Sequence, residues 1–169
     1  TSRDKDYAHL LHKKISDAVG QAKAPELQLA NLSNEKQMKG WEHLSGNDAD
    51  VIVIQISDNY RGKQNAEEFQ NNYAQMIRDL RGDRDPIIVC LTNWGGGKLN
   101  EMIQAAAKEN NALAVDLAPL AANPENKAGS EGHFTNGGVN WHPGDRGMAA
   151  IADAAFTVLE APLKAKAAK

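Results

Sequence analysis

The sequence predicts an α/β protein in which helices cover a parallel sheet. Apolar runs that resemble strands alternate with segments of helical periodicity, the order typical of βαβ units. The run from Val51 to Ile56 is almost unbroken and rich in β-branched residues, as expected of a central parallel strand covered on both faces. At 169 residues the chain fits a single domain, 1–169, with a sizeable core.

The first part of the chain is expected to open on a helix. Residues 6–23 place apolar side chains on one helical face, and Pro25 ends that helix. Residues 26–31 then predict a short strand, and residues 35–44 predict a helix. Folds with a parallel sheet usually open on a strand at the sheet centre, so this start is unusual for the class.

The second part continues the alternation. Residues 65–80 predict a helix that Asn65 and Glu68 begin as a variant of the capping box. The remaining predicted elements are a strand at 86–93, a helix at 98–110, a strand at 112–117, a polar stretch at 122–140 and a closing helix.

Composition and charge exclude several classes of function. The formal net charge is −3 and no Lys/Arg stripe is present, which argues against nucleic acid as a partner. No apolar run has the length of a membrane span. Cys90 is the single cysteine and lies in an apolar strand, so we expect an inert core thiol.

Histidine spacing gives no metal site. His9 and His12 lie on one helix with only two ligands in view, and His43 and His133 have no ligand pattern around them. We therefore expect neither a metal nor a cofactor.

Candidate binding residues follow the strands, because ligands of open parallel sheets bind outside the carboxyl ends of the strands. Asn59 follows the central strand, and its amide is expected to face the crevice; the alternative is a turn residue bonded to its own backbone. Trp94, in "NWGGG", is suited either to stacking on a sugar or to anchoring its loop. The nearby "GGGK" lacks the spacing of a phosphate loop.

His142 lies where the closing helix begins. Pro143 suits a first helical position, and Asp145 in the first turn favours the helix dipole. A neutral imidazole held there is a candidate general base, able to take a proton from a serine and return it to a leaving alcohol.

Three segments resemble conserved blocks of the SGNH (GDSL-type) hydrolases, a family of esterases and lipases. "DADVIVIQISDNY" is similar to the third block, "HPGDRGMAAIAD" to the fifth and, weakly, "LQLANLSN" to the second. "KDYAHLL" and the fifth-block segment also resemble a bacterial carbohydrate-esterase-like subgroup. The resemblance implies a three-layer α/β/α fold with a flavodoxin-like parallel sheet.

The resemblance also implies roles for individual residues. His142 would be the catalytic base, and Asn59 with Ser57 would form the oxyanion hole. Trp94 and Asn31 would contact the substrate.

The chain departs from the family pattern in three places. Ser57 stands where the family has glycine, and Val139 stands where the family has an aspartate three residues before the histidine. A main-chain carbonyl or another carboxylate such as Glu131 must then orient the imidazole, since helix capping explains Asp145 better. The nucleophile block, a Gly-Asp-Ser or Gly-Asn-Ser turn after a first strand, is absent.

The missing block leads to an expectation about the nucleophile. Ser2 has no strand or glycine turn to expose its hydroxyl, and Ser33 and Ser57 lie on crevice loops at positions where the resemblance implies oxyanion donors. We therefore expect the first strand and the serine turn on a segment outside this sequence, which would be the C-terminal portion of a longer chain.

The predicted function is hydrolysis of a carboxylic ester, with removal of acyl groups from a carbohydrate and with the isolated chain inactive. The expected partners are the ester substrate and an N-terminal peptide that carries the nucleophile, and the resemblance favours a periplasmic or secreted protein. The alternative is a non-catalytic glycan-binding module on a degenerate hydrolase fold. A flavodoxin-like nucleotide or signalling domain would need phosphate-binding or acidic loops, which "SDNYRG" and "TNWGGG" match poorly.

Overall fold

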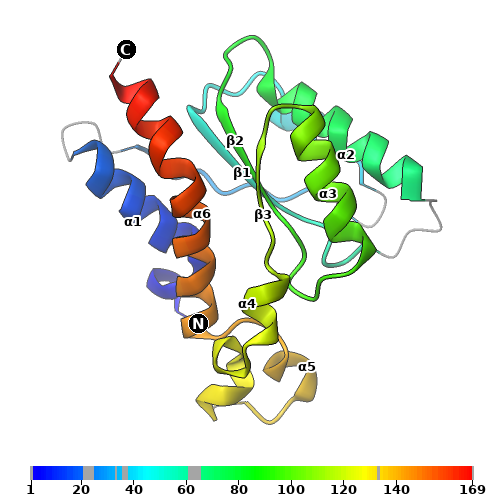
Figure 1. Ribbon diagram of the computed structural model, residues 1–169, viewed down its shortest axis with the longest axis vertical. Coiled ribbons are helices and arrows are strands. Elements are labelled where there is room, and N and C mark those ends of the chain that lie inside the picture. The colour runs from blue at the N-terminus through cyan, green and yellow to red at the C-terminus, as the bar shows by residue number, and fades with distance from the viewer. Residues whose placement is uncertain are drawn as a thin grey trace. The chain divides into compact units, whose positions relative to one another are not determined.

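The computed structural model describes residues 2–20, 25–32, 34–35, 38–60, 66–132 and 134–168 (Figure 1). The chain forms two compact units, each described here by itself. Unit 1 comprises Thr1–Leu29 and Leu117–Lys169, and unit 2 comprises Ala30–Asp116. The predicted α/β class with a parallel sheet is confirmed. The single domain and the three-layer arrangement stay predictions.

Unit 2 is built on three parallel strands with two crossover helices. The strands β1 (Val51–Gln55), β2 (Ile87–Leu91) and β3 (Leu113–Val115) pair in the order β1-β2-β3. Parallel neighbours need crossover connections, supplied here by α2 (Ala66–Arg81) and α3 (Lys98–Glu109). Both crossovers step in the same direction, so they place both helices on one face of the sheet, where they pack side by side (Figure 1).

The core of unit 2 lies between this sheet face and the two helices. Ile54 of β1 is paired in register with Cys90 of β2, and both side chains are buried. Phe69 and Tyr73 of α2 are completely buried, and their ring centroids are 5.9 Å apart. Cys90 thus lies in the core, as predicted.

Two predicted elements before β1 are wrong. Residues 25–32 form no strand, and Leu29 in that segment is 60% exposed, so the apolar alternation there has no buried face. Where a helix was expected at 35–44, residues 38–44 are described without a break and contain a 3-10 helix at Glu42–Leu44 but no α-helix. Met38 and Gly40 have φ values of 50° and 88°, which right-handed helix does not allow. Asn65, the predicted start of α2, lies outside the described residues.

Unit 1 is a pair of packed helices with a series of short turns. The helices α1 (Tyr7–Val19) and α6 (Asp145–Ala167) lie side by side (Figure 1). α1 ends at Val19, before Gly20, whose φ is 82°, and so ends earlier than the predicted end at residue 23. The two helices bury Leu11, Ile15, Gly147, Ile151, Ala152, Ala155, Leu159 and Leu163.

The polar stretch before α6 contains short helical turns. These are α4 (Ala118–Ala122), α5 (Gly137–Asn140) and the 3-10 helices Pro124–Asn126 and Ala128–Glu131. Across the described parts of the chain, no helix combines the length and apolarity needed to cross a membrane.

The environment of Cys90 makes a testable prediction. Burial raises the pKa of the Cys90 thiol from 9.0 to about 12, so the native protein holds the thiol protonated. A thiol reagent such as dithiobisnitrobenzoate should therefore label the protein only as fast as it unfolds, and at once in denaturant.

The raised pKa also sets a pH dependence. Its contribution to the free energy of unfolding is complete below pH 9, the ordinary thiol pKa, and is lost as the pH rises toward about 12. Denaturant unfolding from pH 7 to 11 should show a shallower alkaline loss of stability for Cys90→Ala than for the wild type. Rapid labelling of native protein would contradict this burial.

Candidate functional site

The loop after β1 holds a carboxylate with three hydrogen-bond donors. The main-chain N–H of Ser57 donates to Oε1 of Glu35 at 2.6 Å, and the N–H of Asn59 reaches the same oxygen at 3.3 Å. The side-chain amide of Asn59 donates to Oε2 at 3.1 Å. We call these three donors the anion cradle. They bind both oxygens of one carboxylate, and all belong to the two residues predicted as oxyanion donors.

Ser57 contributes its N–H to the cradle and turns its hydroxyl inward. Its φ is 96°, a conformation that costs a residue with a side chain about 1–3 kcal/mol and that glycine adopts freely. The side chain is 1% exposed, and its hydroxyl donates to Oδ1 of Asn93. The Asn93 amide returns a bond of 3.4 Å to the Ser57 carbonyl. The hydroxyl of Ser57 is therefore engaged in the interior.

A network of polar side chains, all buried except the exposed Asp116, continues from Asn93 along the carboxyl edge of the sheet. The Asn93 N–H donates to Oδ1 of Asn100 at 3.1 Å. The Asn100 amide donates to Thr92 Oγ1 at 2.9 Å and to Asp116 Oδ1 at 3.1 Å. Thr92 in turn donates to Asp116 at 3.2 Å. This polar network, which consists of Ser57, Thr92, Asn93, Asn100 and Asp116, ties together the ends of all three strands.

Trp94 and Asn31 are the predicted substrate contacts of unit 2. Trp94 follows the polar network and is 2% exposed, which is typical of a packing anchor. Asn31 is exposed in the irregular segment before β1. Their contact with a substrate stays a prediction, and Ser33 lies outside the described residues.

In unit 1, His142 has a fixed backbone and an exposed side chain. Its N–H donates to the Val139 carbonyl at 3.1 Å, and its carbonyl accepts from the Ala128 N–H at 2.9 Å. The Trp141 ring meets the imidazole edge-on, with centroids 5.3 Å apart. Among the described residues, none forms a hydrogen bond to the imidazole nitrogens. The ring is therefore accessible, on a turn that the neighbouring segment holds in place.

Glu131 caps the helix that follows His142. Its carboxylate accepts the main-chain N–H of Asp145, the first residue of α6, and so satisfies a free donor at the positive end of the helix. The Asp145 carboxylate forms an ion pair of 2.6 Å with Lys5. Glu131, a candidate for orienting the imidazole, is thus held at the helix N-terminus.

Two glycines at this helix start lie so close to neighbouring atoms that a side chain would displace them. A Cβ on Gly144 would collide with the Glu131 carboxylate, and one on Gly147 would collide with the Asn126 carbonyl oxygen and lie 2.8 Å from Cβ of Pro143. The prediction that Pro143 takes the first helical position is wrong, because Pro143 precedes the N-cap Gly144 and the helix begins at Asp145. The motif "HPGDRG" is therefore a tightly packed helix entry.

The predicted site residues fall into different units. Ser57, Asn59, Trp94 and Asn31 belong to unit 2, and His142 belongs to unit 1. That Asn59 and His142 face the same crevice stays a prediction.

Sequence reasoning missed three residues of the site, Glu35, Asn93 and Asn100. Only Asn100 carried a signal, because it lies on the buried face of α3 with Ile103 and Ala107, where a polar side chain needs partners.

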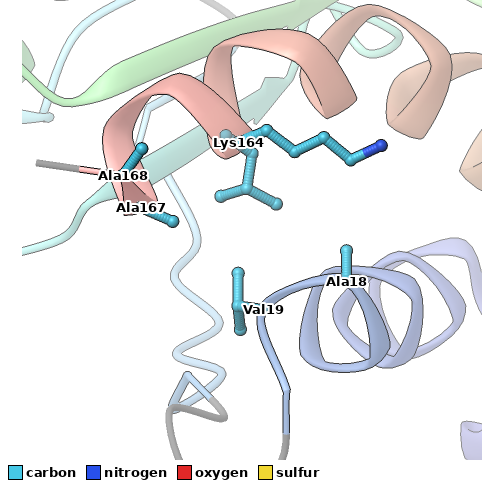
Figure 2. Close-up of a pocket in the computed structure, with 6 residues that line it drawn as sticks. Ala18, Val19, Lys164, Ala167 and Ala168 are labelled. Carbon is cyan, nitrogen blue, oxygen red and sulfur yellow. The ribbon is translucent and has the colours of Figure 1, made fainter.

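The other chemical possibilities are few. In the described residues, no group of three or more His, Cys, Asp or Glu side chains lies close enough to bind a metal ion. A pocket of about 240 Å³ lies between the ends of α1 and α6 (Figure 2), lined by Ala18, Val19, Leu163, Lys164, Ala167 and Ala168. The Lys164 ammonium pairs with Glu160 at 2.6 Å. This lining offers no reactive group.

No protein-family model matches the chain, and no curated protein or solved structure is significantly similar to it. The function must therefore be argued from the arrangement of the residues themselves.

The Ser57 backbone makes a prediction about stability. Ser57→Ala keeps the positive φ and leaves Oδ1 of Asn93 without its donor, so we expect a loss of about 1–3 kcal/mol in the free energy of unfolding. Ser57→Gly loses the same bond but relieves the backbone, and it should be more stable than Ser57→Ala by about 1 kcal/mol. Urea denaturation measures both, with the exposed Ser45→Ala as control. Equal stabilities of the two Ser57 variants would contradict the strained backbone.

The Glu131 cap makes a second prediction. Glu131→Ala should cost about 1–2 kcal/mol of stability, because the Asp145 N–H loses a charged acceptor at the start of α6. Glu125→Ala is the matched control, since Glu125 only forms an exposed ion pair with Arg146, and its loss should cost less than about 0.5 kcal/mol. Thermal or urea unfolding compares the two. Similar small losses would show that Glu131 does not cap the helix.

Proposed function

We propose that this chain is the larger part of a serine esterase of the SGNH (GDSL-type) kind, which removes acyl groups from a carbohydrate. In this proposal the loop after β1 stabilises the reacting oxygen and His142 transfers the proton. The observation that carries the proposal is the anion cradle, in which donors of Ser57 and Asn59 converge on carboxylate oxygens.

The cradle has the chemistry that ester hydrolysis needs. When a nucleophile attacks an ester carbonyl, the oxygen becomes negatively charged, and each donor already aimed at it lowers the barrier by about 3 kcal/mol. The donors must be held rigidly, and the polar network supports this by fixing Ser57 through Asn93. The glycine-like φ of Ser57 also fits the family resemblance, because SGNH hydrolases have glycine at this position.

His142 has the accessibility that a base requires. Its ring is exposed, which leaves room for a serine hydroxyl to approach it. The hydrogen bond from the Ala128 N–H to the His142 carbonyl holds the backbone from which the ring extends. Val139 supplies no carboxylate at the third position before it, so the imidazolium formed during the reaction is less stabilised than in a full triad. A main-chain carbonyl would serve to orient the ring, and we expect a slow enzyme.

The proposal places the nucleophile on a segment outside this sequence. The Ser57 hydroxyl is buried and bonded to Asn93, and Ser2 bonds the Asp4 carboxylate. Both observations also favour the alternative function, a non-catalytic glycan-binding module. Trp94 and Asn31 would contact the carbohydrate in either case.

The test compares the isolated chain with the product of its complete reading frame. Because the isolated chain lacks the serine, it should hydrolyse p-nitrophenyl acetate no faster than its His142→Ala variant. In the complete frame, His142→Ala should lower the rate at least about 100-fold, and added imidazole should restore part of it, because the exposed site admits a free base. A fluorophosphonate probe should label a serine of the added segment. His43→Ala, which removes another exposed histidine, is the control.

Two results would contradict the proposal. Turnover that depends on His142 in the isolated chain would mean that the nucleophile lies within it. A complete product that binds glycans without hydrolysis would establish the binding module instead.

A further inference from the structure

We infer that Glu35 is a built-in occupant of the anion cradle, and that a carboxylate or tetrahedral oxyanion ligand binds this loop by displacing it. The inference rests on the proposed function for the identity of the reacting oxyanion, but not for the binding itself. Both Glu35 oxygens are engaged, one by two main-chain N–H groups and the other by the Asn59 amide. A free anion would use the same donors.

Glu35 reaches the cradle from a separate part of the chain. It lies 22 residues before Ser57, in an irregular segment that an isolated bridge between Asn34 and Lys39 closes. No Lys or Arg of the described residues forms an ion pair with it. The three donors of the cradle hydrogen-bond both oxygens of the carboxylate, which marks the loop as complementary to an anion.

The two sides of this contact differ in rigidity. The polar network fixes Ser57 from behind, through bonds to Asn93, whatever occupies the cradle. Asn59 is exposed, and its N–H bond to Glu35 is long at 3.3 Å, so this end of the contact opens toward solvent. An entering anion can thus bind first to the Asn59 donors and last to the main-chain N–H of Ser57.

The tether gives Glu35 an advantage over a free ligand. A carboxylate on the same chain acts at a high effective concentration, so a dissolved anion competes poorly with it. A ligand displaces Glu35 when it adds contacts of its own or carries more charge on one oxygen. The contact therefore excludes simple anions and selects for a ligand that the rest of the site also binds.

The test is an NMR titration of the folded chain with acetate and, separately, with inorganic phosphate. It follows the main-chain amides of Ser57 and Asn59 and the side-chain amide of Asn59. Without any anion, Glu35→Ala should move all three signals, because they lose a charged acceptor. Acetate should then bind Glu35→Ala at least about tenfold more tightly than the wild type, with Glu35→Gln between them. Glu42→Gln removes an exposed charge elsewhere in unit 2 and should behave as the wild type.

The outcomes separate this inference from the proposed function. Unchanged amide signals in both Glu35 variants, or equal anion affinity in wild type and variants, would overturn the role of Glu35. If the affinity for acetate rises in Glu35→Ala while the complete reading frame shows no esterase activity, the inference about Glu35 is supported and the esterase proposal fails. If His142-dependent hydrolysis is found but removal of Glu35 changes neither anion binding nor KM, the inference about Glu35 fails alone.

Discussion

The side-chain amide of Asn100 holds the carboxyl edge of the sheet together. It donates to Thr92 and Asp116, and its oxygen accepts the N–H of Asn93. Buried polar groups are costly unless all are satisfied, so the ends of β2 and β3 have few alternative arrangements. Asn93 in turn fixes Ser57, and Ser57 contributes its N–H to the cradle, where it donates to Glu35. The direction of the donors is thus decided by side chains buried behind the loop.

The elements that could be predicted from the sequence are those with more than one local signal. β1 and β2 are long β-branched runs bounded by turn residues, and α3 combines helical periodicity with a strand on each side. Residues 26–31 offered only short alternation of apolar and polar residues, which Leu29 shows to be unburied. The periodicity of residues 35–44 was helical, but Met38 and Gly40 adopt positive φ there, and local pattern does not reveal such backbone choices.

In the candidate site, only residues whose location follows from their place in the sequence relative to a strand could be predicted. Asn59 follows a central strand, and parallel sheets place such residues at their ligand-binding edge. The part of Ser57 in the cradle is its N–H, a detail that depends on the positive φ. Glu35 lies 22 positions before Ser57 in the sequence, and no periodicity or motif links the two. Contacts of this kind arise from tertiary packing and have no local signature.

The tight entry to α6 affects how sequences of relatives should be weighed when they are aligned with this chain. A side chain at Gly147 would meet the Asn126 main-chain carbonyl, and one at Gly144 would displace the Glu131 carboxylate that caps the helix. Both glycines would therefore be retained by a relative that keeps this capped helix start, whether or not it catalyses a reaction. Their invariance would record packing. The His142 ring is exposed, so packing constrains residue 142 less than it constrains the glycines, and under the proposed function an imidazole there would be retained for its chemistry. A relative with both glycines but another residue at position 142 would keep the helix start without the proposed base.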